Sequence, residues 1–316
     1  MNNVIVYPLT PQQSRYQRLA LRQELVIKTY VLFHGIIANG KAASGCYDGF
    51  ASAWAARKHF GYKADVEYLP VAYGHPVPTI PAGSVVYILD FSYSREVMLE
   101  LAETHKKVVC LDHHVTAQEA LKGLEHPNLE VVFDMARSGA LITWDYFNPD
   151  KRPPHLIAAV SDRDLWKFEI LGSKEIHTYL QSYPFDFCKW DEICESLEQD
   201  VGRKAAIESG VAIVRFRDSQ VKQTCDQAEL CEIAGYEVPV VNATGFWSEV
   251  GHELLARYPD NKFAVSWYRA GDGQVKLSFR SRKDFDCSAV AKVFGGGGHA
   301  QAAGAAVPYA NWSYHQ

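Results

Sequence analysis

Two short segments of the chain carry residue types that could do chemistry together. Residues 111–114 read Leu-Asp-His-His and follow the apolar run 108–110. Such a run is typical of a buried parallel strand, which would deliver an acid and two imidazoles at its carboxyl end, where open α/β sheets place their sites. Residues 295–304 read Gly-Gly-Gly-Gly-His-Ala-Gln-Ala-Ala-Gly, and the bare backbone N–H groups of such a loop could bind an anion. One segment is suited to metal and the other to phosphate, which together indicate a metal-dependent phosphoesterase.

The composition is that of a soluble globular enzyme, with 47% hydrophobic and 22% charged residues over 316 positions. A chain of this length favours two domains. The net charge of −5 argues against a surface built for long duplex DNA, but it leaves room for a small basic pocket that binds a short nucleotide. Seven scattered cysteines without a CxxC pair are typical of reduced thiols. Since no apolar run reaches membrane-spanning length and no signal-peptide pattern opens the chain, we expect a cytoplasmic protein without membrane contact.

The alternation of strand and helix patterns predicts a doubly wound, mostly parallel α/β sheet. Strands are expected at residues 30–34, 66–71, 84–90, 107–112 and 129–133. The helices between them are expected at about 49–60, 94–105 and 116–121. Thr116 and Glu119 have the spacing of a capping box, which predicts that the last of these helices begins at Thr116.

We divide the chain into four parts. Residues 1–28 form a polar extension with a helix over 11–26, residues 29–189 a metal-binding catalytic domain, residues 190–224 a helical connector, and residues 225–316 a smaller α/β domain that binds substrate. In the smaller domain the patterns predict strands at 238–241, 263–268 and 275–280 and a helix at 287–294.

Acids, imidazoles and one thiol recur at or just after the ends of the apolar stretches of the first domain. They are His34, Cys46, Asp48, Asp90, Asp112, His113, His114 and Asp162. In a parallel sheet the carboxyl ends meet at one edge, so residues far apart in sequence can share a site. Any one of these residues could be an ordinary polar group at a strand end, but the ordered set favours a metal site. A mixed Asp/His set suits Mn²⁺ or Mg²⁺, and two such ions can bind phosphate and generate hydroxide at neutral pH.

Over residues 30–307 the chain resembles the DHH phosphoesterase superfamily and its accompanying DHHA1 domain. The resemblance rests on His34, the segment 46–50 (Cys-Tyr-Asp-Gly-Phe), Asp90, the Asp-His-His of 112–114, the Ser-Asp of 161–162, and the downstream segments 277–281 and 295–304.

The resemblance implies two divalent ions bridged by Asp90. One ion would be completed by Asp48, His113 and Asp162, and the other by His34 and Cys46. The resemblance also implies catalytic roles for two further residues. His114 would face the substrate phosphate, and Asp112 would orient the imidazoles. The ions are expected to be Mn²⁺, with Mg²⁺, Co²⁺ or Zn²⁺ as alternatives.

Two features depart from the usual pattern of the superfamily. Cys46 stands where an aspartate is usual, and a thiolate favours softer ions such as zinc, iron or cobalt. Residues 36–45 look like an insertion, and His34 reaches the metal if this segment folds back. Within the insertion, residues 35–41 nearly match a P-loop, but Ala42 replaces the hydroxyl that should bind Mg²⁺, so an NTPase is not favoured.

The smaller domain supplies the residues expected to bind substrate. Arg280 offers a planar fork for phosphate, and Ser281 a hydroxyl beside it. Glycines 296–298 allow close approach of the backbone, and an imidazole adds a donor at the end of the loop. The expected set is Arg280, Ser281, Gly296, Gly297, Gly298 and His299.

These observations favour a hydrolase that cleaves short single-stranded oligonucleotides or small nucleotide phosphoesters by metal-hydroxide attack and releases 5′-mononucleotides. Two alternatives stay open: an exopolyphosphatase, and a non-catalytic nucleotide-binding or regulatory protein with a degraded metal site. The sequence allows a homodimer and predicts no membrane partner.

Overall fold

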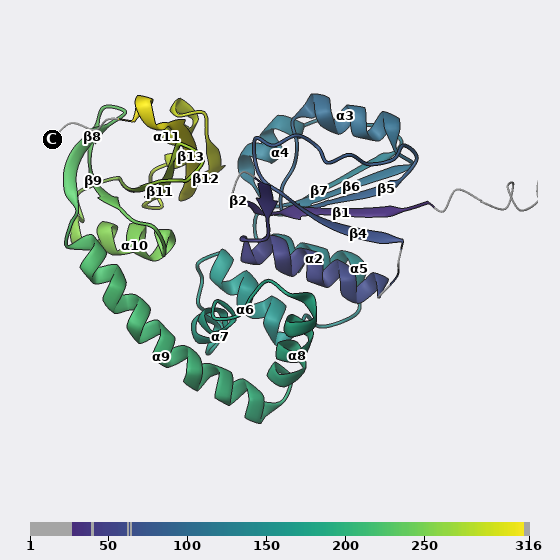
Figure 1. The fold of residues 1–316 in the computed structure, drawn as a ribbon, viewed down its shortest axis with the longest axis horizontal. Helices are drawn as coiled ribbons and strands as arrows, with labels where there is room; N and C mark the ends of the chain where they lie inside the picture. Colours follow the sequence, from purple (N-terminus) through teal and green to yellow (C-terminus); the bar gives the residue numbers. More distant parts are fainter. Residues whose placement is uncertain (1–26, 39–40, 62, 64, 313–316) are drawn as a thin grey trace, which may run out of the picture.

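The computed structural model describes residues 27–38, 41–61, 63 and 65–312, and they form two domains joined by one long helix (Figure 1). The helix expected over residues 11–26 lies outside the described residues. Among the described residues, no helix is both long and apolar enough to cross a membrane.

The first domain is built on a five-stranded parallel sheet. Its strand order is β4-β1-β5-β6-β7, where the strands are β1 (Thr29–His34), β4 (Val66–Val71), β5 (Val85–Leu89), β6 (Lys107–Asp112) and β7 (Leu129–Phe133). The order reverses between β1 and β5, and open α/β sheets bind ligands at such a switch point, beyond the carboxyl ends of the strands.

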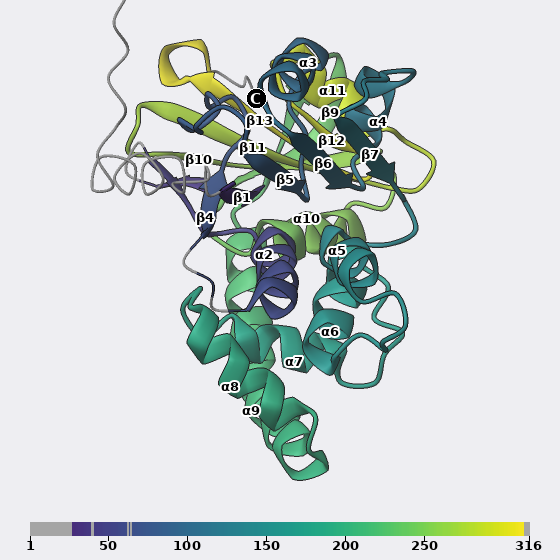
Figure 2. The same ribbon diagram turned by 90° about the vertical axis from the view of Figure 1, so that its right-hand side faces the viewer.

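Helices cover both faces of this sheet, as the two views show (Figures 1 and 2). Helices α2 (Tyr47–Phe60) and α5 (Gly139–Phe147) bury one face, where Val31, Val109 and the fully buried Trp54 lie in one core. Helices α3 (Arg95–Thr104) and α4 (Val115–Leu121) cover the other, where Met98 packs against Ile88. The doubly wound sheet predicted from the sequence is confirmed.

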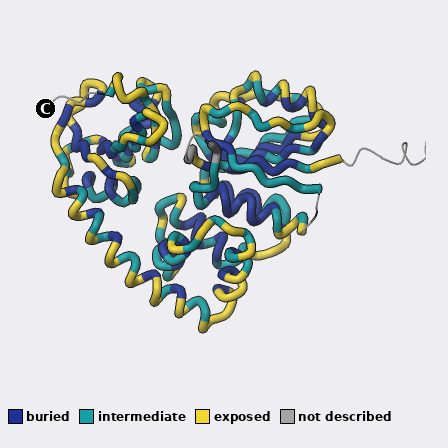
Figure 3. The backbone as a smooth tube through the Cα atoms, viewed as in Figure 1, coloured by how far each residue is buried: buried dark blue, intermediate teal, exposed yellow. Residues whose placement is uncertain are grey.

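A helical layer follows the sheet, made of α6 (His155–Asp164), α7 (Ser173–Leu180) and α8 (Phe187–Leu197). Trp190 of α8 is fully buried in the same core as Trp54. The connector was expected to begin at residue 190, but this packing makes α8 part of the first domain. The connection between the domains is α9 (Asp200–Cys225), which alternates buried and exposed residues along its length (Figure 3).

The second domain contains a six-stranded mixed sheet of order β12-β13-β11-β10-β9-β8. Its strands are β8 (Glu229–Ile233), β9 (Tyr236–Asn242), β10 (Phe263–Arg269), β11 (Gln274–Ser281), β12 (Gly297–His299) and β13 (Ala302–Pro308). The described helices of this domain are α10 (Trp247–Arg257), α11 (Cys287–Val293) and the short η1 (Tyr309–Asn311). The smaller α/β domain is thus confirmed, with more strands than the sequence predicted.

The inserted segment after β1 folds back as a hairpin of β2 (Ile36–Ala38) and β3 (Lys41–Ala43). Gly35 makes this possible, because a Cβ atom there would lie 2.4 Å from the carbonyl oxygen of Ala43. A hairpin takes the place of the loop and helix that a P-loop needs. The capping-box prediction was wrong: α4 begins at Val115, and its N-cap is His114 rather than Thr116.

Candidate metal centre

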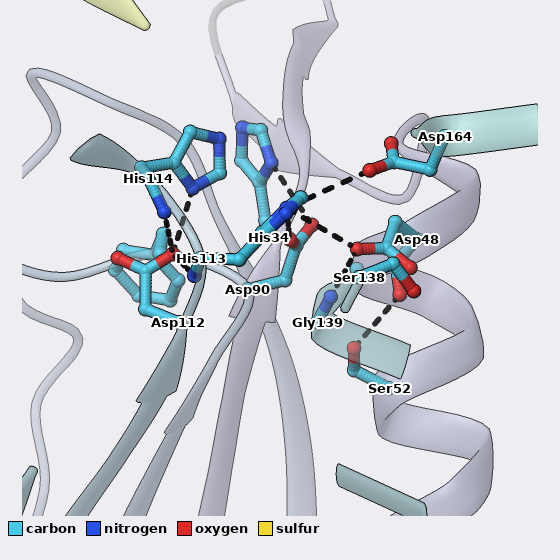
Figure 4. Close-up of polar contacts among 12 residues, drawn as sticks. His34, Asp48, Ser52, Asp90, Asp112, His113, His114, Ser138, Gly139 and Asp164 are labelled. Atoms are coloured by element: carbon cyan, nitrogen blue, oxygen red, sulfur yellow. Dashed lines mark hydrogen bonds and ion pairs between the residues drawn. The ribbon is translucent and has the colours of Figure 1, made fainter. Parts of the chain in front are cut away.

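The acids and imidazoles of the first domain meet at the carboxyl edge of the sheet, at the switch point between β1 and β5 (Figure 4). His34 ends β1, Asp90 follows β5, and Asp112 ends β6. Asp48 and Cys46 come from the start of α2, which follows β1 across the hairpin. The hairpin leaves His34 at this edge.

Asp90 lies at the centre of the cluster. Its Oδ2 atom is 3.3 Å from His34 Nδ1 and 3.5 Å from Cys46 Sγ, while its Oδ1 atom is 3.1 Å from His113 Nε2. The backbone of Asp90 is left-handed, with φ 64°, a conformation that Asp tolerates better than most residues. Asp90 therefore belongs to three potential ligand sets, one with His34 and Cys46, one with Asp48 and His113, and one with Asp112 and His114.

Asp48 is held by the amino end of another helix. Its carboxylate accepts hydrogen bonds from Gly139 N at 2.6 Å and Ala140 N at 3.0 Å, the first residues of α5. The positive end of α5 stabilises this buried charge. Asp48 Oδ2 also lies 3.5 Å from His113 Nε2, so α2 and α5 together place a carboxylate beside the β6 imidazole.

Asp112 is fully buried and fixes the orientation of His114. Its Oδ1 atom accepts from His113 N and His114 N and lies 2.7 Å from His114 Nδ1. Burial lowers the pKa of His114, but the Asp112 carboxylate outweighs this effect and raises it. This geometry matches the orienting role that the resemblance implies for Asp112.

Asp162 and Asp164 both lie at the end of α6, and Asp164 is the one that faces the cluster. Asp164 Oδ2 is 3.7 Å from His113 Nε2. The carboxylate of Asp162 instead accepts from Glu169 N and Ile170 N at 3.1 Å each, and from the Ser173 hydroxyl. Asp162 was expected near a strand end, but it lies in a helix and organises the loop that follows. The structure places it outside the cluster.

The charges in the cluster perturb one another strongly. Burial raises the pKa of Asp48 well above its usual range, and Asp90 and Asp164 raise it further. Burial also raises the pKa of Asp90, but the neighbouring imidazoles of His113 and His34 outweigh it and hold that pKa well below the usual value. Burial lowers the pKa of His113, yet the three carboxylates raise it to about 10. One imidazole thus faces three acids.

The donor set fits divalent cations. Within the described ranges no Lys or Arg forms an ion pair with Asp48, Asp90 or Asp164, so the acids outnumber their partners. Asp90 Oδ1 is buried without hydrogen-bond geometry, although an imidazole nitrogen lies 3.1 Å away. A buried, unsatisfied carboxylate oxygen is costly unless a cation or donor satisfies it. Carboxylate, imidazole and thiolate ligands suit Mn²⁺, Co²⁺ and Zn²⁺.

The second domain reaches this cluster through β12. The His299 ring stacks on His114 with centroids 4.5 Å apart, and it lies 4.8 Å from the His113 ring. Burial lowers the pKa of His299 to about 3, with further lowering by the two neighbouring imidazoles, so His299 is neutral at pH 7. Beside it, Lys292 pairs with Glu119 of α4 at 3.8 Å. The predicted substrate residue His299 therefore lies directly against the predicted metal ligands.

Arg280 is a partly buried arginine of β11 that has no carboxylate partner in the described part of the chain. Its guanidinium donates to Ser278 Oγ, Phe279 O and Ser248 Oγ, at 3.1, 2.7 and 2.7 Å. Burial lowers the pKa of Arg280 to about 10, and the charge of Arg163 lowers it further. A guanidinium in this setting suits an anionic ligand.

Ser281 and the glycine run are arranged differently from the expectation. The Ser281 hydroxyl lies 2.7 Å from Phe285 O and 2.9 Å from Ala300 O, so it is directed into its own domain.

The expected glycine loop is a helix end followed by a short strand. Gly296 N donates to Ala291 O, and Gly297 and Gly298 pair with β13. A Cβ atom at Gly296 would lie 2.0 Å from Gly304 O, so close approach of two backbones explains that glycine.

Three residues at the site were not identified from the sequence. Asp164 follows Ile157 and Val160 at helical spacing, and this period could have identified it, although Asp164 itself is exposed. Tyr73 lies two residues beyond β4, with its ring 4.9 Å from that of His34 and 51% exposed. Gly139 allows α5 to approach, because a Cβ atom there would lie 2.6 Å from Asp90 Cβ. Nothing in the local sequence signals that approach.

Residues 248–312 match the DHHA1 domain family. The uncharacterized protein R106 of Acanthamoeba polyphaga mimivirus is 30% identical over 295 residues, which are 87% of this chain. The chain spans 66% of the length of that relative.

Among solved structures, the DHH domain of a member of a ribosomal protein family aligns with a TM-score of 0.55 at 11% identity, over 92% of this chain and 85% of that one. The pGpG-specific phosphodiesterase PggH from Vibrio cholerae aligns with a TM-score of 0.45 at 14% identity, over 90% and 94% of the two chains. An uncharacterized protein from Helicobacter pylori G27 gives a TM-score of 0.42 at 14% identity, over 89% and 93%.

The DHHA1 match covers residues 248–312 of the second domain, and the DHH-domain structure shares the fold of the chain. The Asp-His-His of residues 112–114 stands at the end of β6, among the clustered acids. The chain is thus similar to the DHHA1 family in its second domain, and it shares its fold with a DHH-domain structure.

Proposed function

We propose that this protein is a divalent-metal-dependent phosphoesterase that hydrolyses short oligonucleotides or small nucleotide phosphoesters. The observation that carries the proposal is the position of Asp90, which belongs to the His34–Cys46 set and also to the Asp48–His113 set. A carboxylate shared by two ligand sets is what a pair of ions needs to lie close enough to act on one phosphate.

The ligands would divide between two ions. His34, Cys46 and Asp90 would hold one, and Asp48, Asp90, His113 and Asp164 the other, with Asp164 in place of Asp162. When bound, the ions would neutralise phosphate charge and lower the pKa of water. Cys46 is the soft member of the set, and it favours Zn²⁺ or Co²⁺ beside Mn²⁺.

The chain's own residues would bind and orient the substrate. Because Asp112 Oδ1 lies against Nδ1 of His114, the Nε2 atom of that imidazole can face a phosphate oxygen. Neutral His299 can donate a hydrogen bond to the same phosphate from the second domain, and Arg280 of that domain supplies a cation. A phosphate between the two domains would therefore have protein donors on one side and the ions on the other.

Tyr73 favours a substrate that carries a base. Tyr73 is half-exposed, and its ring lies 4.9 Å from that of His34 and 6.0 Å from that of His114, beside the cluster. Aromatic side chains beside a phosphate site stack bases without requiring a particular sequence. A polyphosphate would make no use of such a ring.

A panel assay tests the proposal. Wild-type protein with Mn²⁺ is given a dinucleotide, 3′-phosphoadenosine 5′-phosphate, a cyclic dinucleotide and polyphosphate. We expect turnover of nucleotides and loss of that turnover in Asp90→Asn, since Asn keeps the shape and tolerates φ 64° but ligates poorly. Turnover of polyphosphate alone would establish the exopolyphosphatase, and absence of turnover with every substrate and metal would favour a binding protein.

A further inference from the structure

Glu249 lies where the two domains and the connecting helix meet. It stands in the first turn of α10, and its Oε1 atom accepts from Arg163 Nη2 of α6 at 3.0 Å and from Arg217 Nη1 of α9 at 3.5 Å. The side chains of Arg163 and Glu249 are only 15% and 11% exposed. Of the described ion pairs, this one joins the domains beneath the surface, whereas the Lys292–Glu119 pair is exposed.

Arg217 connects the same point to the rest of the first domain. Its Nη1 atom also donates to Thr178 Oγ1 of α7 at 3.1 Å, and its other nitrogens bond Asp218. Glu249 is therefore held by two arginines whose positions are fixed by α6, α7 and α9. Truncating one partner of such a buried pair leaves the other charge uncompensated.

An aromatic stack lies beside the ion pair. The Trp166 ring has the Arg163 guanidinium 4.2 Å from its centroid and the His252 ring of α10 stacked at 4.1 Å. Trp166 and Phe168 both adopt left-handed backbone conformations, with φ 55° and 51°, which is unusual for bulky residues. Strained residues of this kind persist only where the surroundings hold them, and they occur at functional sites.

Helix α10 in turn positions Arg280. Ser248, next to Glu249, accepts from Arg280 Nη2, and Gly251 packs on the arginine stem, where a Cβ atom would lie 2.5 Å from Arg280 Cγ. At the other end of the connection, Arg163 precedes Asp164, which faces the metal cluster. A continuous series of contacts thus runs from Asp164 to Arg280.

A cavity of about 450 Å³ borders this series, lined by Trp166, Arg217, Glu249, His252 and neighbouring residues. The Arg163–Glu249 ion pair and the Trp166–His252 stack join α10 to the first domain beside this space.

We propose that Glu249 and Arg163 are positioning residues that fix α10 against α6 and so hold Arg280 opposite the metal centre. The inference rests on the proposed function, since it assumes that both groups act on one substrate. Their contact sets how the substrate-binding domain sits over the cluster, and substrates that span the domains depend on it.

The test compares Glu249→Gln with Glu198→Gln in the full chain. Glu198 is a matched control, because it also accepts from two residues, Arg152 and His155, but both belong to the first domain. With a dinucleotide and Mn²⁺, we expect Glu249→Gln to raise KM by about 10- to 100-fold, as loss of orientation does. Hydrolysis of bis(p-nitrophenyl) phosphate, which is too small to span the domains, should stay unchanged, and solution X-ray scattering should show a larger radius of gyration.

If Glu249→Gln is unstable, Arg163→Gln gives the same readouts. In the double variant Arg163→Gln/Glu249→Gln the two effects on KM should not add, because each change removes the same contact. A variant with wild-type KM and wild-type scattering would overturn the inference. If the wild-type protein cleaves neither substrate, the proposed function fails, and scattering alone then decides whether the pair holds the domains together.

Discussion

Two acids at the end of α6 are near in sequence but differ in surroundings. Asp162 is surrounded by donors from its own loop, whereas Asp164 faces His113 and shares its space with other acids. Burial raises the pKa of Asp164, as expected for a carboxyl without a cationic partner. We infer that the first is structural and the second a metal ligand.

Substituting these two acids should separate the roles. Asp164→Asn should lower activity by at least about 100-fold, since even outer partners of metal ligands cost 10- to 100-fold, with little change in stability. Asp162→Asn should lower the free energy of unfolding by about 2 kcal/mol, because charged hydrogen bonds are lost. Turnover and thermal unfolding of both variants check this. The reverse pattern would restore Asp162 as the ligand.

Cys46 is the residue whose replacement should change metal preference. Its Sγ atom caps α2 and lies 3.5 Å from Asp90, so it is placed to ligate. Cys46→Asp should retain activity with Mn²⁺ and lose preference for Zn²⁺ or Co²⁺, because a carboxylate is a harder ligand. Cys46→Ala should bind less metal. If Cys46→Ala equals wild type in metal content and rate, the thiol is not a ligand.

Metal binding should strengthen as pH rises. Burial and neighbouring acids raise the pKa of both Cys46 and Asp48 well above their usual values. The neighbouring carboxylates raise the pKa of His113 to about 10, against the effect of burial. Cys46 and His113 therefore hold protons at pH 7, and those protons must leave when a metal binds these atoms. Calorimetric titration with Mn²⁺ in two buffers of different ionisation enthalpy should therefore show proton release. Identical heats in both buffers would contradict it.

At the scale of elements, the site depends on how α5 meets the sheet edge. The amino end of α5 binds Asp48 through two N–H groups and presses Gly139 against Asp90. One helix end thus fixes the positions of two proposed ligands. An added methyl group at Gly139 cannot be accommodated without moving Asp90.

Gly139→Ala should therefore disturb the centre more than the fold. We expect more than about a tenfold loss of activity from misplacement of Asp90, with destabilisation of about 1–3 kcal/mol from overpacking. Gly271→Ala is the matched control, because a Cβ atom there would meet nothing within 4 Å. Equal activity of the two variants, measured with the same substrate, would show that Asp90 can shift without cost.

Most strands of the first domain could be predicted well because their patterns are local, whereas the β2–β3 hairpin and α5 were not predicted. The strands at Val66–Val71, Lys107–Asp112 and Leu129–Phe133 were predicted to the residue, since each is a short stretch rich in apolar residues and bounded by polar residues or turns. Strand β12 was missed, because Gly297 and Gly298 have no strand propensity and pair with β13 only where the backbones approach closely. The direction of the Asp162 side chain was predicted wrongly, because Asp162 was expected at a strand end and lies in helix α6 instead.

At the scale of the molecule, two domains bring different chemistry to one point. His299 of the second domain stacks on His114 of the first, and α10 is tied to α6 through Glu249. No local pattern could have predicted these contacts, because they depend on how α9 orients the domains. The residue types of the site were readable from the sequence, whereas the contact between its halves was not.

The central claim is that two ions share Asp90, and metal stoichiometry tests it most directly. Metal-free protein is titrated with Mn²⁺ by calorimetry, and bound metal is then measured by elemental analysis, for wild type and Asp90→Asn. We expect two ions per wild-type chain and loss of both high-affinity sites in the variant, since Asp90 serves each set. Wild-type stoichiometry and affinity in Asp90→Asn, or no bound metal in the wild-type protein, would contradict the account.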